Sequence, residues 1–425
     1  MNHQKLLMIA YHFPPIGGAG ALRALKTAKY LPLYGWAPII LTVKNPDWYY
    51  AQDDQLLKDV PPTAAIVRSF MLRSAWFYRI LNPLRINRLD LLLKIYLMHP
   101  DEQIGWQPFA LHKAVSIIKN DHIDAIYSTS APLTSHLIAY RISKRFGIPW
   151  IADFRDEWLE NPDLPLPTAF HRYLHYRLEG MIAKAADKVI TAAPVFSRLL
   201  AKHCPNEAKF ETITMGFDPD DYRDFPVVPK PRNEKFTVAF SGLFYGSFRP
   251  DPLLKAVNHL IAEGNIDRQT VCLRFIGANA PHDLREPDKY GICEFTGFLP
   301  HERALHLAGQ SDVLLLLLSR ERGKDVIPSK TFEYMALRKP VLAVVPSDGH
   351  VTDIIRETGI GPVADFDTPS DIKHAFLQMY RQWTNGSSNC HPNAHEIENY
   401  SYINLTGRFA SLLDQIAQRP QQEYS

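Results

Sequence analysis

The chain has 425 residues, a hydrophobic content of 46% and a formal net charge of +2 at pH 7. This length suggests two or three domains, and the composition is typical of a globular protein with a large core. The small net charge excludes nucleic-acid binding driven by bulk positive charge. The cysteines show no close pair or metal-ligand spacing, and no apolar run reaches signal-peptide or membrane-spanning length, so we expect a cytoplasmic protein that touches a membrane only at its surface.

The first predicted elements are a strand at residues 6–10, a loop containing Gly17 and Gly18, and a helix at residues 21–31. A strand, a glycine loop and a helix are the usual start of a doubly wound α/β domain, and such a loop lets a phosphate approach backbone amides. The alternative is a tight strand-to-helix turn without a ligand. The next predicted strand ends without an acid, which disfavours a dinucleotide-dependent oxidoreductase.

Residues 67–98 interleave basic and aromatic side chains. Arg73, Arg79 and Arg85 are among the basic residues, Trp76 is one of the aromatic residues, and a single acid opposes them. This pattern is typical of a segment that lies on an anionic membrane surface. The alternative is a pair of helices packed on the domain, with their arginines in solvent.

A third region of interest follows a predicted strand at residues 150–152, where Asp153, Arg155 and Asp156 occur together. Ligand-binding groups of open α/β sheets collect at the carboxyl ends of strands, so two acids around one arginine predict a polar site there. The alternative is a structural ion pair. His136, in the preceding predicted helix, either faces this site or lies on the helix surface.

Residues 219–234 are rich in proline and charge and are the predicted linker between two domains, at residues 1–218 and 235–395. The second domain also opens with a strand and a glycine turn, at Gly242. Two similar halves predict a cleft between them, and residues 396–425 form a final helix and tail.

The second domain contains the longest stretch of sequence that indicates a ligand site. An apolar run at residues 313–318 predicts a strand buried on both faces, and Pro328 and Ser329 predict the start of a helix. A helix start offers unpaired N–H groups to a phosphate, Lys330 adds a full charge, and Glu333 can accept hydrogen bonds from sugar hydroxyls. The alternative is that Ser329 only caps the helix and Glu333 only complements its dipole, which is worth about 0.5 kcal/mol.

Several stretches together resemble glycosyltransferase family 4, in the order YHFPPIGGAGALR, STSAPLTSH, IADFRDEW, ADKVITAAP, MGFDPDDY, FSGLFYGSFRP, GFLPHERALHLAGQSDVLLLL and IPSKTFEYMALRKPVLAVVP. They cover nearly the whole chain. The resemblance implies the GT-B fold, an α/β architecture of two Rossmann-like domains facing across a cleft, with the final helix crossing back to the N-terminal domain. It also implies sugar transfer from a nucleotide-sugar donor with retention at the anomeric carbon, without a metal or a further cofactor.

The same resemblance assigns roles in the second domain. Glu333 matches the acid that binds the ribose hydroxyls, and Asp325, eight positions earlier, stands where the family has a glutamate at the donor sugar. Arg249 matches one of two basic residues that bind the donor phosphates. Leu243 occupies the position of the other, so Lys330 is expected to supply the missing charge. Base and sugar specificity are expected to depend on the surroundings of Phe244, Phe298 and residues 319–327.

In the first domain, Gly17 and Gly18 match the loop that faces the donor phosphates, and Asp156 falls near the acceptor and the reacting sugar. The predicted catalytic residues are therefore Asp156, Arg249, Asp325 and Lys330, and the other predicted donor-binding residues are Gly17, Gly18, Gly242, Ser329 and Glu333.

The expected acceptor is a saccharide, lipid-linked and used in surface polysaccharide or glycolipid assembly. Residues 67–98 are expected to hold the protein on the inner face of the cell membrane, with Arg73, Trp76, Arg79 and Arg85 on the acceptor and membrane side. The open alternatives are a sugar-nucleotide epimerase or hydrolase of the same fold, a non-catalytic membrane-associated scaffold with a degenerate donor pocket, and a transferase with a soluble acceptor.

Overall fold

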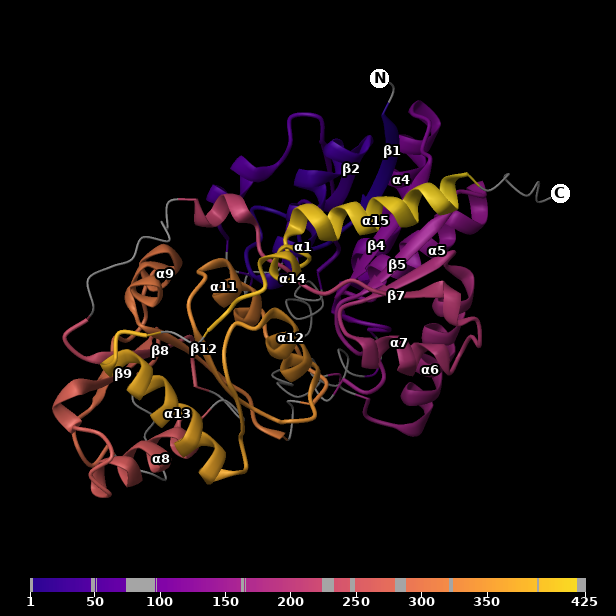
Figure 1. Cartoon of the computed structure of the whole chain (residues 1–425). Helices are drawn as coiled ribbons and strands as arrows, with labels where there is room; N and C mark the ends of the chain where they lie inside the picture. The colour runs from indigo at the N-terminus through magenta and orange to yellow at the C-terminus, as the bar shows by residue number, and fades with distance from the viewer. Residues whose placement is uncertain are drawn as a thin grey trace, which may run out of the picture. The chain divides into compact units, whose positions relative to one another are not determined.

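The computed structural model describes residues 3–46, 50, 52–73, 96, 98–161, 164, 166–223, 233–244, 249–279, 288–320, 324–387 and 390–418. The chain forms two compact units (Figure 1): unit 1 contains Met1–Met215 and Tyr402–Ser425, and unit 2 contains Gly216–Ser401. The sequence analysis placed these limits at residues 218 and 396. Most of the predicted linker and of the basic, aromatic segment, including Trp76, Arg79 and Arg85, lies outside the described residues.

Unit 1 contains a parallel sheet with strand order β3-β2-β1-β4-β5-β6-β7. The strands are β1 (Gln4–Ile9), β2 (Trp36–Val43), β3 (Ala65–Ser69), β4 (Ala125–Ser130), β5 (Trp150–Phe154), β6 (Lys188–Thr191) and β7 (Phe210–Thr212). The α-helices are α1 (Ala19–Tyr30), α4 (Gln107–Asn120), α5 (Thr134–Phe146), α6 (Ala169–Ala185), α7 (Pro194–Ala201) and α15 (Tyr402–Ala417).

Both faces of the unit 1 sheet are covered. Along β1, Leu7 and Ile9 belong to one hydrophobic core, whereas Leu6 and Met8 belong to the core on the opposite face. A strand buried on both sides requires a continuous apolar run rather than an alternating one, which is what the sequence contains.

Helix α15 completes the second core of unit 1. Its buried residues pack in the same core as those of α1, beside which it lies in Figure 1, and Trp36 Nε1 of β2 donates a 2.9 Å hydrogen bond to Asp414. The predicted return of the final helix to the N-terminal domain is therefore confirmed.

Unit 2 contains a second parallel sheet, with strand order β10-β9-β8-β11-β12-β13. The strands are β8 (Phe236–Ser241), β9 (Val271–Ile276), β10 (Cys293–Phe295), β11 (Val313–Leu317), β12 (Val341–Val345) and β13 (Val363–Asp365). The α-helices are α8 (Asp251–Ala262), α9 (His301–Gln310), α11 (Lys330–Ala336), α12 (His350–Thr358), α13 (Pro369–Thr384) and α14 (Ala394–Glu398).

Two parallel, helix-covered sheets confirm the predicted doubly wound α/β architecture. Each strand order reverses at one place, between β1 and β4 in unit 1 and between β8 and β11 in unit 2. Ligands of such sheets bind outside the carboxyl ends of the strands at this switch point. Among the described helices, none combines the length and the apolar content that crossing a membrane requires.

Candidate functional site

The switch point of unit 2 is occupied by the segment after β8 and by the helix after β11. Gly242 follows β8 with φ at +130°, a conformation that L side chains rarely adopt. Its N–H donates to the Ile276 carbonyl at 2.8 Å, which places it at the carboxyl end of β9 as well. Lys330 is the first residue of α11.

The Lys330 ammonium is held against Gly242. A Cβ atom on Gly242 would lie 2.2 Å from Lys330 Nζ, and this nitrogen lies 4.2 Å from the centroid of the Phe240 ring. Burial lowers the pKa of Lys330 from 10.5 to about 8, against the opposing attraction of Glu333. The ammonium is thus largely charged at pH 7 but weakly hydrated, and such a group binds an anion more strongly than an exposed lysine does.

Helix α11 is fixed to the sheet by Tyr334. Its hydroxyl accepts a 3.2 Å hydrogen bond from Ser241 N of β8 and donates one of 3.3 Å to the Leu315 carbonyl of β11. The helix begins where the sequence predicted and ends at Ala336. Ser329 makes no side-chain capping bond, so the interpretation of this residue as a simple cap is wrong. With seven residues, α11 has a short dipole, and the Lys330 charge is the main cation at its start.

The other predicted residues of unit 2 lie in the loops that follow β8 and β10 and in the segment before α11. Arg249, directly before α8, donates from Nε to Asp251 Oδ2 at 2.8 Å, and its side chain is 24% exposed. Asp325 is half-buried in the segment before α11. Phe244 stacks on Phe240 with a centroid distance of 5.1 Å, whereas Phe298 is 86% exposed.

An ion-pair network that the sequence did not predict holds Arg320, at the start of the 319–327 segment. Arg320, just after β11, pairs with Asp348 and Asp365 at 3.2 Å and with Asp367 at 3.0 Å. These acids follow or end β12 and β13, so the network connects the start of the 319–327 segment to two neighbouring strands. Acids that lie 28 to 47 positions after Arg320 carry no local signal that they share this arginine.

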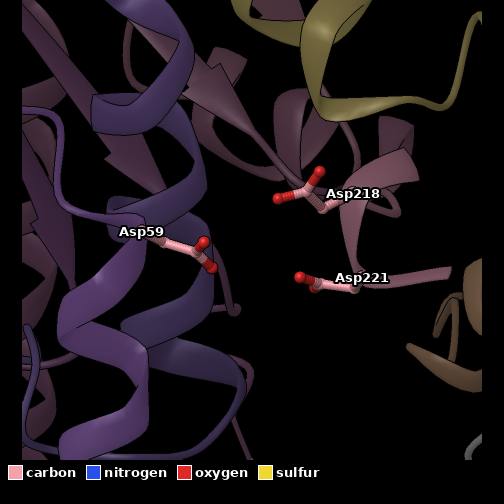
Figure 2. A group of neighbouring side chains, drawn as sticks. All are labelled: Asp59, Asp218 and Asp221. Carbon is pink, nitrogen blue, oxygen red and sulfur yellow. The ribbon is translucent and has the colours of Figure 1, made fainter. Parts of the chain in front are cut away.

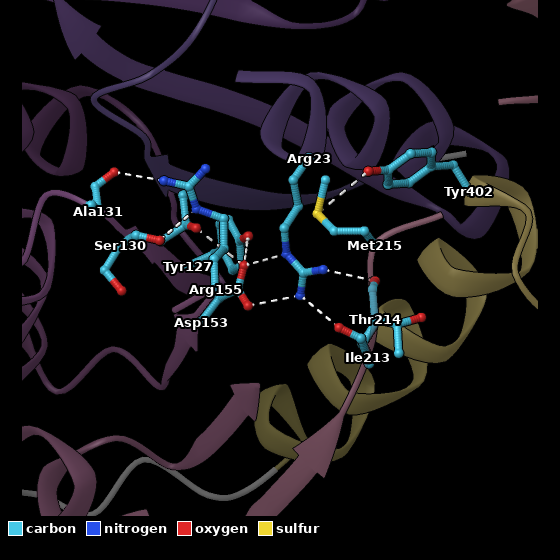
Figure 3. Close-up of polar contacts among 11 residues, drawn as sticks. Arg23, Tyr127, Ser130, Ala131, Asp153, Arg155, Ile213, Thr214, Met215 and Tyr402 are labelled. Atoms are coloured by element: carbon cyan, nitrogen blue, oxygen red, sulfur yellow. Dashed lines mark hydrogen bonds and ion pairs between the residues drawn. The ribbon is translucent and has the colours of Figure 1, made fainter. Parts of the chain in front are cut away.

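The switch point of unit 1 holds the glycine loop that was predicted to receive a phosphate. Gly18 precedes α1 with φ at +93°, and apart from its two chain neighbours no atom of the described residues lies within 4 Å of the place where its Cβ would be. A Cβ on Gly20, in contrast, would lie 2.2 Å from Arg155 Nη1. Arg155 donates to the backbone carbonyls of Ser130 and Ala131 (Figure 3), so its guanidinium lies beside the first turn of α1.

Asp153 corrects part of the sequence prediction. Strand β5 continues to Phe154, so Asp153 is a strand residue and is completely buried. It accepts hydrogen bonds of 2.8 Å from both Nε and Nη2 of Arg23, which points toward it from α1 (Figure 3), and one from Tyr127. Burial alone would raise the pKa of Asp153, but the attraction of Arg23 lowers it. Asp153 is thus half of a structural ion pair and not part of an open site with Arg155.

The two positions predicted for His136, at the helix surface or beside a ligand, are not the position that it occupies. It is completely buried, with Nδ1 2.8 Å from Ser128 Oγ. Burial lowers the pKa of His136 to about 3, and burial together with Arg155 does the same for His12. Both rings are neutral at pH 7. Arg155 donates to two backbone carbonyls, and its guanidinium adds a positive charge beside the first turn of α1.

The immediate surroundings of Asp156 are different from those of the glycine loop. Asp156 is exposed in the loop after β5 and lines a cavity with residues of α6 and α7. Arg73, the described member of the predicted membrane-side set, donates to the carbonyls of Asn45 and Pro46 at 3.0 and 2.7 Å.

Two of the carboxylates drawn in Figure 2, those of Asp59 and Asp218, have partners within their own units. Asp59 of unit 1 pairs with Lys26 at 2.7 Å and with Lys29 at 3.4 Å. Asp218 of unit 2 accepts a 3.0 Å hydrogen bond from the N–H of Asp220 at the start of a 3-10 helix, Pro219–Tyr222. We assign no metal to these acids.

Comparisons with known proteins agree with this geometry. The family model described as Glycosyl transferases group 1 matches residues 235–382, which lie in unit 2. A glycosyltransferase from Rickettsia africae ESF-5 is similar at 15% identity and a TM-score of 0.63, over 99% of this chain and 100% of that chain. HepE from Anabaena in complex with UDP is similar at 13% identity and a TM-score of 0.61, over 97% of this chain and 100% of that chain.

A UDP-forming alpha,alpha-trehalose-phosphate synthase from Burkholderia vietnamiensis is similar at 12% identity and a TM-score of 0.59, over 97% of both chains. At these identities the likeness shows the fold, and it confirms the predicted GT-B class. No curated protein matches the chain.

Proposed function

We propose that the protein is a retaining glycosyltransferase of family 4 type, which transfers a hexose from a nucleotide-sugar donor to a saccharide acceptor. One observation carries the proposal: the ammonium of the half-buried Lys330 lies against Gly242 at the switch point of unit 2, inside the stretch that matches the glycosyltransferase model. Related folds solved with UDP and with UDP-glucose support a nucleotide-sugar as the donor.

In this proposal unit 2 binds the donor. Lys330 and Arg249 stabilise the negative charge that develops on the leaving diphosphate, because they are charges already in place before the bond to the sugar breaks. Ser329 contacts the phosphates, Glu333 accepts hydrogen bonds from the ribose, and Asp325 contacts the donor sugar. The leaving phosphate accepts the proton of the attacking hydroxyl, so the reaction needs neither a metal nor a dedicated strong base.

Unit 1 is proposed to contribute an anion-binding point and the acceptor side. Gly17 and Gly18 leave the first turn of α1 open to a phosphate group, and Arg155 adds a cation beside it. Asp156 contacts the acceptor. The acceptor is proposed to be a lipid-linked saccharide of surface polysaccharide or glycolipid assembly, reached from the inner face of the membrane through residues 67–98.

A donor-consumption assay tests this function. The purified protein is incubated with UDP-, GDP- and ADP-sugars and a lipid extract, and nucleoside diphosphate release is measured. Lys330→Met and Glu333→Gln are each expected to slow release by about 10²–10³-fold, whereas Lys255→Met, at an exposed position on α8, is the control and should not. Near-normal turnover in both site variants would contradict the assignment, and sugar release that is independent of any acceptor would favour a hydrolase or epimerase.

A further inference from the structure

Unit 1 contains a cavity of about 380 Å³. Among the residues that line it, Asp156 is the one to which the proposed function gives a role. The cavity lies between α6, α7 and the loop that follows β5. This volume falls within the range of about 300–1,000 Å³ that small-molecule sites occupy. The walls include buried apolar side chains such as Phe154, Trp158 and Leu200.

One wall of the cavity carries a buried hydrogen-bonded pair. Glu179 of α6 and His203, just after α7, lie 2.8 Å apart, and their side chains are 7% and 6% exposed. Gly180 makes this approach possible, because a Cβ there would be 3.0 Å from the His203 ring. Burial raises the pKa of Glu179. Perturbed carboxyl groups inside largely apolar cavities are a common property of ligand sites.

The rim of the cavity carries aromatic side chains that are open to solvent. Tyr173 and Tyr176 of α6 line the cavity and are 55% and 52% exposed. Their rings offer apolar faces, and their hydroxyls can donate and accept hydrogen bonds. Phe170 is also on α6 and is 64% exposed, but it does not line the cavity.

The charges at the rim disfavour an anionic ligand. Asp156, Glu157 and Glu160 outnumber the two bases, Arg172 and Lys202. Arg172 also lies 4.0 Å from Glu160, so these two charges offset each other and leave Asp156 and Glu157 against Lys202. A phosphate or a lipid headgroup of the same sign would meet net repulsion, whereas a neutral ligand with many hydroxyls finds carboxylate acceptors.

We propose that this cavity is a saccharide-binding site that receives sugar residues of the acceptor. Sugar rings present C–H faces that fit the Tyr173 and Tyr176 rings, and hydroxyls that donate to the surrounding carboxylates. Asp156 on the rim would then contact the same saccharide. That this saccharide is the acceptor rests on the proposed function, whereas saccharide binding itself does not.

Saturation-transfer NMR with the whole protein tests the proposal, without any donor present. The probes are methyl glycosides of glucose, galactose, mannose and rhamnose, N-acetylglucosamine, maltose and lactose, with decyl phosphate as the competing anionic probe. At least one saccharide is expected to bind, and Tyr173→Ala and Tyr176→Ala should each weaken it about three- to tenfold. Phe170→Ala is the matched control and should leave it unchanged.

Binding of no saccharide, binding of decyl phosphate alone, or an equal loss in Phe170→Ala would overturn the proposal. Because Lys330 lies in unit 2, Lys330→Met should weaken nucleotide binding at least about tenfold and leave the NMR signals intact. If nucleotide binds and no saccharide does, the saccharide site is wrong and the transferase proposal stands. If saccharides bind and no nucleotide does, the saccharide site stands and the transferase proposal falls.

Discussion

Replacing Lys330 with methionine keeps an unbranched side chain of similar length and removes its charge. In the folded protein burial lowers the pKa of Lys330 from 10.5 to about 8. A difference of this size corresponds to about 3 kcal/mol, by which burial disfavours the ammonium relative to the unfolded chain. Lys330→Met is therefore expected to be more stable than the wild type at pH 7, by up to about 3 kcal/mol.

The sign of the pH dependence follows from which state holds the proton. Between pH 8 and pH 10.5 the unfolded chain keeps the Lys330 proton and the folded protein releases it. The wild type therefore gains stability as the pH rises through this window, and the advantage of Lys330→Met shrinks toward zero. Other titrating groups are common to both proteins and cancel in the difference.

Urea unfolding of both proteins at several pH values between 7 and 10.5 measures this difference. Lys255→Met, which removes an exposed lysine from the same unit, provides the control and should show no such trend. A stability gap that is constant over the whole range, or a Lys330→Met protein less stable than the wild type at pH 7, would refute the argument that the ammonium is held against its solvation preference.

Three further predictions concern residues at the switch points. Gly242→Ala should weaken nucleotide binding in calorimetric titrations, because the added Cβ displaces the neighbouring Lys330 ammonium. Gly264→Ala is the control for backbone strain alone, because Gly264 has φ at +72° and open space around the position of a Cβ. Arg23→Met should destabilise unit 1 by about 3–5 kcal/mol, because it leaves the Asp153 carboxylate buried without its ion-pair partner. Chemical denaturation measures this loss and shows whether adding Asp153→Asn restores part of it. Arg155→Leu should leave the melting temperature nearly unchanged and lower turnover about 10²-fold, so unchanged turnover would remove Arg155 from the site.

The main elements of the fold could be predicted because their signals are local. The apolar run of β11 is a strand buried on both faces, as predicted, and the apolar positions of the last helix are those that pack in unit 1. The glycine loops also carry a local signal. Gly18 and Gly242 both adopt positive φ angles that other residues rarely adopt, and both lie at the switch points where the strand order reverses.

The pairing of charges could not be predicted, because it depends on contacts between residues far apart in the chain. Asp153 and Arg155 are two positions apart in sequence, yet Asp153 pairs with Arg23, 130 positions away. Asp153 is a buried residue of β5, whereas Arg155 lies beyond the end of this strand and donates to the carbonyls of Ser130 and Ala131. The complete burial of His136 could not be predicted for a similar reason. A histidine does not reveal from its sequence position whether its face of the helix packs on the sheet.

The central claim is that unit 2 binds a nucleoside diphosphate through Lys330. Calorimetric titration of UDP, GDP, CDP and ADP into the wild type, Lys330→Met and Lys255→Met at pH 7 measures this binding directly. The account predicts that at least one of the four binds the wild type and Lys255→Met equally, and Lys330→Met at least about tenfold more weakly. Binding of none of the four, or equal binding to all three proteins, would contradict it.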